Sequence, residues 1–449
     1  QITFLQLNTK KLWQQKQKRN PSKSFLVSHP NLAIYEGTLA FDTIRHNQSF
    51  RSMDCTSNLQ KKFVDKKFSC ARTKCEAIAV NVFSPWAFLE LKKDLQSVQF
   101  VTISYDTSNH NHVKLLPILV RYFQRDCAKD LINNKLDKMA GLSADYTNTN
   151  FGGLLRRGTE NVHTKLQTEL GRDIFGFGCN AHIIHNGAKT AFDCLPVDIE
   201  VMNYFESETT ELWLFFAHSH AAIFNQSILK IESDDKCVIV SGAVVKDLIF
   251  KLKARKNAKF VPLVVKPELT KLIAENIIIE DSYLETSKEF YETAISFLEA
   301  WNDNNDDMSE LKCLLSDCKP SRSEFDEAVL SLSSKCAICN VNSDDLFDEQ
   351  MARNKQLFSK KQYTIYNFKR IVEHELAMCW PSSNAPVERV FSRINNYWTK
   401  EKSRMDLNTV EAVLSVLINF DFSCDIFSQL LEKNLEILKK IHSSEKYGV

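Results

Sequence analysis

Three consecutive segments near the C-terminal end carry apolar residues at the spacing of an α-helix. The first follows Pro386, a residue suited to a first helical turn, with Ser383 or Asn384 before it as N-cap. The apolar faces consist of Val387, Val390, Phe391 and Ile394, of Val410, Val413, Leu414 and Leu417, and of Phe427, Leu430, Leu431, Leu435 and Leu438. Together they have more apolar surface than one helical hairpin can hide. They predict a helical unit whose surplus surface either forms an oligomer interface or packs on the rest of the chain.

Strand-like segments occur earlier in the chain. Phe100–Tyr105 alternates and is rich in strand-forming residues. His112–Phe123 is a second apolar run, interrupted by Pro117, and Met139–Ala144 is a shorter third candidate. These runs predict a β-rich stretch between about residues 100 and 144.

Helices are predicted on both sides of that stretch. Arg72–Leu91 and Asn180–Cys194 each have helical character, and helical periodicity dominates from Ala221 to Lys360. Within this last region Thr286–Glu289 has the pattern of a capping box, which predicts a helix start before an apolar face. The two faces singled out here are Val245, Leu248, Ile249 and Leu252, and Tyr291, Ala294, Ile295 and Leu298.

The length and composition are those of a globular protein with more than one structural unit. The chain has 449 residues, of which 44% are hydrophobic and 25% charged, so two to four units are expected. Gln1–Lys74 contains 14 Lys and Arg against 4 Asp and Glu, whereas Asn302–Gln350 contains 4 against 12. The basic end favours contact with nucleic acid, although a solvated lysine-rich surface would have the same composition.

The cysteines and the first residues indicate the cellular compartment. The 13 cysteines have no regular spacing, the N-terminus lacks a secretory cleavage pattern, and no apolar run reaches the roughly 18 residues of a membrane span. We therefore expect free thiols in a reducing compartment, the cytosol or the nucleus. Because the chain begins with Gln, we also expect it to be part of a longer product.

The segment around the first C-terminal helix resembles a known family signature. Pro381–Ser392, with the sequence PSSNAPVERVFS, is followed by KSRMDL at Lys402–Leu407 and by a helix that ends at Asn419. This arrangement resembles the C-terminal signature of hAT-family DNA transposases. Tyr105–Asn109 and Gly141–Gly153 resemble the family's two catalytic-aspartate segments, and Cys179-x-x-His182 resembles its Cys-x-x-His motif. The resemblance covers most of the chain from about residue 30.

The resemblance implies an α/β fold, with a ribonuclease-H-like core split by an all-helical insertion and a helical dimerisation region at the end. The corresponding parts are a basic N-terminal segment at 1–98, the first part of the core at 99–220, and the helical insertion with acidic loops at 221–360. The last core helix and the dimerisation region then occupy 361–449.

The resemblance also implies a set of functional residues. Asp106, Asp145 and Glu388 would be the catalytic carboxylates, which bind two Mg²⁺ or Mn²⁺ ions for phosphodiester displacement. The nucleic-acid-binding residues would be His182, Arg156, Arg157 and Arg389, and the dimerisation residues would be Val410, Val413, Leu414 and Leu417. Structural roles are the alternatives, since strand-end aspartates commonly form turns and a carboxylate in a first helical turn compensates the helix dipole.

Two cysteine sets raise the question of zinc. Cys179, His182 and His185 lack a fourth ligand nearby in the sequence, so a zinc site is not favoured there. The set Cys313, Cys318, Cys336 and Cys339 has a spacing close to that of a zinc ribbon, but ordinary thiols are favoured in this acidic region. Asn148–Gly153, with the arginines that follow it, is either a phosphate-binding turn or a plain surface turn.

Several departures from the family bear on catalysis. No Arg-Trp pair occurs in the chain, the gap from Phe123 to Met139 is short, and Tyr146 stands where Asn is common. We therefore expect a transposase-derived, dimer-forming nuclear protein that binds DNA and whose catalysis is eroded. An active transposase and a non-enzymatic DNA-binding or adaptor protein are the alternatives. The expected partners are DNA and a second copy of the chain, not a membrane or a small-molecule substrate.

Overall fold

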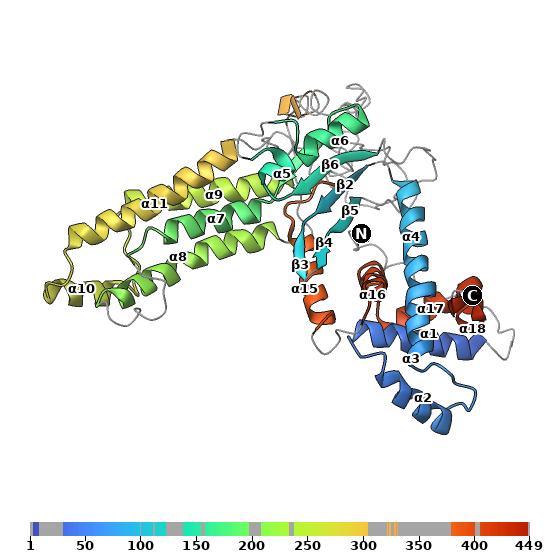
Figure 1. The fold of residues 1–449 in the computed structure, drawn as a ribbon. Helices are drawn as coiled ribbons and strands as arrows, with labels where there is room; N and C mark the ends of the chain where they lie inside the picture. Colours follow the sequence, from blue (N-terminus) through green and yellow to red (C-terminus); the bar gives the residue numbers. More distant parts are fainter. Residues whose placement is uncertain are drawn as a thin grey trace, which may run out of the picture. The chain divides into compact units, whose positions relative to one another are not determined.

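The computed structural model is mostly helical and contains a small, largely parallel sheet, as expected for an α/β fold (Figure 1). It describes residues 3–8, 30–98, 100–110, 113–122, 138–153, 158–196, 208–232, 238–303, 379–399 and 405–447, together with 321, 323, 324, 327, 328 and 330. The chain divides into two compact units. Unit 1 contains residues 1–99, 103–135 and 386–449, and unit 2 contains residues 100–102 and 136–385.

The strands of unit 1 lie around β5, Pro117–Tyr122. β1, Thr3–Asn8, pairs with β5 in parallel, from Thr3 opposite Pro117 to Asn8 opposite Tyr122. The end of β2, Val101–Tyr105, is the other neighbour of β5, and β3 (Ser108–His110) forms an antiparallel hairpin with β4 (Val113–Leu115). The predicted strand at residues 100–105 is confirmed, and Pro117 begins β5, a position where a strand tolerates proline.

The helices of unit 1 come from both ends of the chain. The N-terminal ones are α1 (Pro30–Arg45), α2 (Ser52–Phe63), α3 (Arg72–Ile78), a π-helical stretch (Ala79–Phe83) and α4 (Ser84–Ser97). The C-terminal ones are α15 (Ala385–Tyr397), α16 (Leu407–Asn419), α17 (Cys424–Glu432), α18 (Leu435–His442) and a 3₁₀ turn (Ser444–Tyr447). The helix predicted at Arg72–Leu91 is confirmed as this run of α3, the π-helical stretch and α4.

These N- and C-terminal helices share one apolar core. The rings of Phe41 from α1 and Phe427 from α17 stack with their centroids 3.8 Å apart, and Phe83 contacts Phe427 edge to face. Val413 and Val416 of α16 are buried in the same cluster. Most residues of the apolar faces predicted near the C-terminus are therefore covered by residues of the same chain.

One C-terminal prediction is wrong in detail. The third apolar face, predicted as one helix from Phe427 to Leu438, forms two helices, α17 and α18. The break occurs at Asn434, whose side-chain oxygen accepts a hydrogen bond from the Ile437 backbone N–H and so caps α18. Leu435 is exposed as a result.

The strands of unit 2 include two parallel neighbours. β6, Met139–Ala144, pairs with β7, Phe175–Gly178, from Gly141 opposite Phe175 to Ala144 opposite Gly178. The start of β2 is the other neighbour of β6, and the Val101 N–H donates a hydrogen bond to the Lys138 carbonyl at 2.9 Å. All residues of β6 and β7 are buried. The predicted strand at residues 139–144 is confirmed, and two short helices, α5 (Asn148–Phe151) and α6 (Val162–Leu170), lie between β6 and β7 in the chain.

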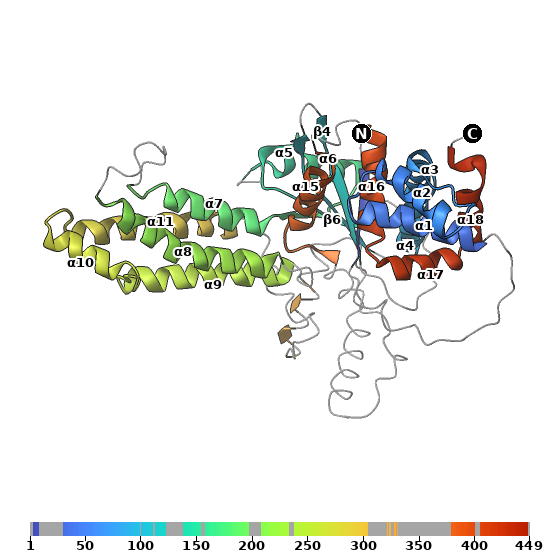
Figure 2. The same ribbon diagram turned by 90° about the horizontal axis from the view of Figure 1, so that it is seen from below.

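The remaining helices of unit 2 form an elongated bundle. They are α7 (Asn180–Phe192), α8 (Thr210–Ile231), α9 (Val238–Asn257), α10 (Lys266–Ala274) and α11 (Glu280–Asp303). α7 and α9 each lie beside both α8 and α11, as Figures 1 and 2 show. Both apolar faces predicted for this region are buried in the bundle.

The predicted capping box is wrong. Thr286–Glu289 lies inside α11, which begins at Glu280, and the Thr286 hydroxyl donates to the Ser282 carbonyl within the helix. A Thr-x-x-Glu pattern also fits an exposed helix interior, so the pattern alone does not mark a helix start. Among the described helices, none is both long and apolar enough to cross a membrane.

Candidate functional site

The pairing of β6 with β7 brings Asp145 and Cys179 together in unit 2. Ala144 and Gly178 are opposite each other at the ends of these parallel strands, so the next residues on the two strands are Asp145 and Cys179. Neighbouring strands lie about 4.8 Å apart, which keeps two such residues close. Asp145 is further held by its backbone carbonyl, which accepts hydrogen bonds from the Thr147 N–H at 2.8 Å and the Asn150 side chain at 3.0 Å.

His182 joins this pair from the first turn of α7. Its Nδ1 lies 2.7 Å from Oδ1 of Asp145, and the side chains are 34% and 27% exposed. The ligand atoms of Asp145, Cys179 and His182 all lie within 4.8 Å of one another, and Cys179 is fully buried. We call these three residues the Asp–Cys–His cluster. The contact with Asp145, and a smaller contribution from Cys179, raise the pKa of His182 to about 11, against the opposing effect of burial.

Neighbouring residues fix the cluster from two sides. The backbone N–H of Asn384 donates a hydrogen bond to Sγ of Cys179 at 3.3 Å. Asn180, the residue after Cys179, is buried and its side chain donates to the Ser241 hydroxyl of α9 at 2.7 Å. The start of α7 is thereby attached to the helical bundle, so the positions of Cys179 and His182 depend on the packing of unit 2.

The other two predicted catalytic carboxylates belong to unit 1. Asp106 directly follows β2, and its Oδ1 accepts a hydrogen bond from the Thr107 N–H at 2.7 Å. Burial, with a smaller contribution from Asp106, raises the pKa of the preceding Tyr105 to about 12. Glu388 lies in the first turn of α15 and is partly buried. Asp145 lies in unit 2, so the meeting of all three carboxylates stays a prediction.

The predicted nucleic-acid-binding residues differ in accessibility. Arg389 is exposed on α15, and His182 is partly exposed with its Nδ1 against Asp145. Arg156 and Arg157 lie outside the described residues, as do Cys313, Cys318, Cys336 and Cys339. Contact with nucleic acid therefore stays a prediction for His182, Arg389 and the two arginines.

The predicted dimerisation residues are covered within unit 1. Val410, Val413 and Leu414 are 2%, 0% and 4% exposed, and Leu417 is partly buried. Val410 and Leu414 pack with α15 and with Leu119 of β5, whereas Val413 and Leu417 belong to the core shared with α1. These side chains stabilise unit 1, and their role in dimerisation stays a prediction.

A basic surface marks the end of α2 in unit 1. Lys61, Lys62, Lys66 and Lys67 are all exposed there, and Asp65 is the acidic residue among them. Phe63 is 71% exposed, and the Lys62 ammonium lies 5.1 Å from its ring centroid. We call these four lysines and Phe63 the α2 basic surface. It places part of the positive charge seen in the N-terminal sequence on an accessible helix end.

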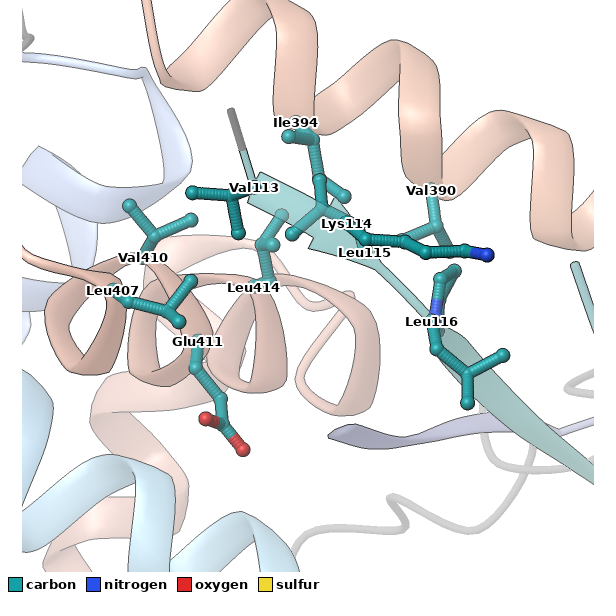
Figure 3. Close-up of a pocket in the computed structure, with 11 residues that line it drawn as sticks. Val113, Lys114, Leu115, Leu116, Val390, Ile394, Leu407, Val410, Glu411 and Leu414 are labelled. Atoms are coloured by element: carbon teal, nitrogen blue, oxygen red, sulfur yellow. The ribbon is translucent and has the colours of Figure 1, made fainter. Parts of the chain in front are cut away.

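An apolar pocket of about 140 Å³ lies beside α15 and α16 in unit 1 (Figure 3). Lys114 and Glu411 are its charged residues, and the Glu411 carboxylate points away from the converging apolar side chains. The lining residues are Val113, Lys114, Leu115, Leu116, Pro117, Val390, Ile394, Leu407, Val410, Glu411 and Leu414. This lining has no set of metal ligands. The described residues hold two such sets, the Asp–Cys–His cluster of unit 2 and the group Asp42, His46 and Cys424 of unit 1.

The Asp–Cys–His cluster is a poor fit to Mg²⁺, the ion that the family resemblance implies. Mg²⁺ takes oxygen ligands in octahedral geometry, whereas the groups gathered around the Asp145 carboxylate are a thiol and an imidazole. Sequence reasoning considered Cys179 and His182 with His185, but His185 is exposed and outside the cluster. The signal it missed was the short strand before Cys179, which places that residue beside Asp145.

No protein-family model and no curated protein matches this chain.

Proposed function

We propose that the protein is derived from a hAT-family transposase, with a ribonuclease-H-like core, and that it binds DNA without retaining strand-cleavage activity. The observation that carries this proposal is the contact between two motifs that lie apart in the sequence. Asp145, from the second aspartate segment, lies against His182 of the Cys-x-x-His motif. A shared ancestral active site explains why both motifs occur at the ends of neighbouring strands. The helical bundle that follows β7 fits the implied insertion.

The loss of activity is proposed from the surroundings of Asp145. Its Oδ1 is in ion-pair contact with His182, so this oxygen is not free to bind a catalytic Mg²⁺ unless the contact is broken. Tyr146, the neighbouring residue that departs from the family pattern, packs between the rings of Phe151 and Trp301. The groups next to Asp145 are thus an imidazole and an aromatic ring, not the further carboxylates that Mg²⁺ binding would require.

The test of this part is strand cleavage of a nicked or hairpin-ended duplex by the full chain with Mn²⁺. We expect no cleavage above that of the Asp106→Asn and Asp145→Asn variants. Cleavage by the parent that either substitution abolishes would establish the alternative, an active transposase.

DNA binding is proposed for the α2 basic surface. Four exposed lysines provide charges for phosphate groups, and the exposed Phe63 ring provides a surface for base stacking. Affinity for duplex DNA should fall steeply with salt. Replacing Lys62, Lys66 and Lys67 by Ala should reduce the slope of log affinity against log salt by about 0.9 for each phosphate that is no longer neutralised.

The matched control is replacement of Lys433, Lys439 and Lys440, three exposed lysines at the end of α17 and in α18 of the same unit, by Ala. We expect this control to bind DNA as the parent does. Equal loss of affinity in both variants would show a general charge effect, and an affinity insensitive to salt would exclude the proposed mode of binding.

Self-association and nuclear localisation complete the proposal. Self-association is proposed from the resemblance at Ala385–Ser392. Nuclear localisation is proposed from the DNA binding and from the absence of disulfides among the seven cysteines of the described residues. Sedimentation of the full chain at tens of micromolar tests self-association, and a chain that sediments as a monomer would contradict it. Imaging of a fluorescent fusion tests nuclear localisation, and exclusion of the fusion from the nucleus would contradict it.

A further inference from the structure

The Asp–Cys–His cluster draws its three ligand-type side chains from different backbone elements. Asp145 follows β6, Cys179 follows β7, and His182 lies in the first turn of α7. An oxygen, a sulphur and a nitrogen atom therefore lie within 4.8 Å of one another, and the parallel pairing of two buried strands fixes two of them. Such a cluster is positioned by the fold itself, because none of the three residues lies on a long loop.

The donor set has a defined metal preference. Zn²⁺ binds Cys sulphur at about 2.3 Å, His nitrogen at about 2.0–2.1 Å and Asp oxygen at about 2.0–2.2 Å, in tetrahedral geometry. Nitrogen and oxygen ligands at these lengths around a tetrahedral ion are about 3.3 Å apart. The three ligand atoms lie within 4.8 Å of one another, and the 2.7 Å contact between His182 Nδ1 and Asp145 Oδ1 has to open to admit the ion. Thiolate ligands select against Mg²⁺ and Ca²⁺, which prefer oxygen.

Exposure around the cluster is asymmetric. Cys179 is fully buried, whereas the side chains of Asp145 and His182 are 27% and 34% exposed. An ion held by these three groups would have the thiolate on its buried side and solvent on the other. Three protein ligands with one water is the arrangement of reactive zinc sites, while structural sites use four protein ligands.

We propose that Asp145, Cys179 and His182 bind a thiophilic divalent cation, Zn²⁺ in the first place, and leave one coordination position open to water. The ion replaces the direct contact between His182 and Asp145 and bridges them to the Cys179 sulphur. This proposal is independent of the proposed function, because the cluster can bind zinc whether or not the chain binds DNA.

The test uses Co²⁺ as a spectroscopic probe with the full chain. We expect one equivalent of Co²⁺ to give the absorption of a tetrahedral site with a thiolate-to-cobalt band, and Zn²⁺ to displace it. The Cys179→Ser and His182→Ala variants should lose this band. Loss of a residue that only orients a ligand already weakens metal binding about 10–100-fold, so loss of a ligand should weaken it at least about 100-fold.

Matched controls separate the cluster from the chain's other thiols and imidazoles. Cys194→Ser and His185→Ala alter a partly exposed cysteine and an exposed histidine of the same unit. Cys424→Ser alters the other Asp, His and Cys group, that of Asp42, His46 and Cys424 in unit 1. All three variants should keep the thiolate-to-cobalt band of the parent. Because Cys179 is buried, Asp145→Asn provides a second test if Cys179→Ser does not fold. Asp145→Asn changes a partly exposed side chain without changing its size.

Three results would overturn the proposal. The first is an unchanged thiolate-to-cobalt band in Cys179→Ser or, if that variant does not fold, unchanged Co²⁺ affinity in Asp145→Asn. The second is displacement of Co²⁺ by excess Mg²⁺, which would indicate an oxygen-ligand site. The third is the absence of binding by the folded parent. All of these are measured without DNA, so they are distinguishable from a failure of the proposed function.

Discussion

The ring of Tyr146 lies directly against the backbone of Gly178, at the point where β7 leads into the Asp–Cys–His cluster. A Cβ atom added to Gly178 would lie 1.6 Å from Cε2 of Tyr146. Tyr146 cannot easily move away, because the rings of Phe151 and Trp301 lie at centroid distances of 5.7 and 5.3 Å. The absence of a side chain at Gly178 is therefore a condition for the present packing.

Gly178→Ala should destabilise unit 2. The added methyl group must displace a packed aromatic ring, and overpacking of this kind costs about 1–3 kcal/mol. Denaturant unfolding measures the loss, and Co²⁺ binding should weaken with it because Cys179 is the next residue. The matched control is Gly242→Ala in α9, where an added Cβ meets nothing within 4 Å. There alanine should stabilise the helix by about 0.5–1 kcal/mol, and equal effects of the two substitutions would contradict the argument.

His220 of α8 should make the helical bundle sensitive to mild acid. Its Nδ1 donates to the Phe216 carbonyl at 2.8 Å, so its Nε2 accepts the Tyr291 hydroxyl at 2.6 Å and the ring is neutral. Burial lowers the pKa of His220 to about 4, and Arg255 of α9 adds to the lowering, while the bond to Phe216 opposes it. Since the unfolded chain binds this proton near pH 6.5, stability is present above that pH and is lost as the pH falls toward 4.

Lowering the pH from 7.5 to 5 should therefore cost about 2 kcal/mol through His220 alone. His220→Gln retains an acceptor for the Tyr291 hydroxyl but cannot take up a proton. Between pH 7.5 and 5 the unfolding free energy of this variant should therefore fall by about 2 kcal/mol less than that of the parent. His218→Gln, an exposed histidine of the same helix, should keep the pH dependence of the parent. Parallel pH profiles for the parent and His220→Gln would show that His220 is not the titrating group.

The buried ion pair of Glu36 and Lys74 joins α1 to α3 in unit 1. The two side chains are 1% and 9% exposed, and Glu36 also accepts hydrogen bonds from the Ser69 N–H at 2.6 Å and hydroxyl at 3.0 Å. Lys74→Met should cost about 3–5 kcal/mol, because it leaves a buried carboxylate without its counter-ion. The double variant with Glu36→Gln should recover most of this loss in denaturant unfolding. Lys93→Met, which removes an exposed pair with Glu90, should cost no more than about 1 kcal/mol, and a larger cost there would point to a packing effect instead.

Periodicity predicted those elements whose pattern is long or strongly apolar. β2 and β6 and the buried faces of α9, α11 and α16 follow from alternation or from helical spacing. β7 was missed because Phe175–Gly178 is four residues long and half glycine, too short to show a period. α1 and α2 were missed because polar and charged residues interrupt their apolar positions.

Hydrophobic periodicity does not predict which residues pack against a buried helix face. Helical spacing shows which side of α17 is apolar, but it does not show that Phe427 stacks on Phe41, almost the whole chain away. The Asp–Cys–His cluster was only partly predicted for the same reason. Cys179 and His182 share one turn of sequence, whereas the contribution of Asp145 depends on the parallel pairing of β6 with the unpredicted β7.

The shared core of unit 1 leads to a last prediction, that the C-terminal helices do not fold alone. A peptide of residues 385–449 would expose the faces that α1 and the π-helical stretch cover, including Val413, Phe427 and Leu431. We expect little helix by circular dichroism until a peptide of residues 30–98 is added, and then a 1:1 complex with increased helicity. A 30–98 peptide with Phe41→Asp should not restore the helices, because it puts a charge against the Phe427 ring. If residues 385–449 instead form a helical dimer alone, the prediction is wrong, and the dimerisation role implied for Val410, Val413, Leu414 and Leu417 gains direct support.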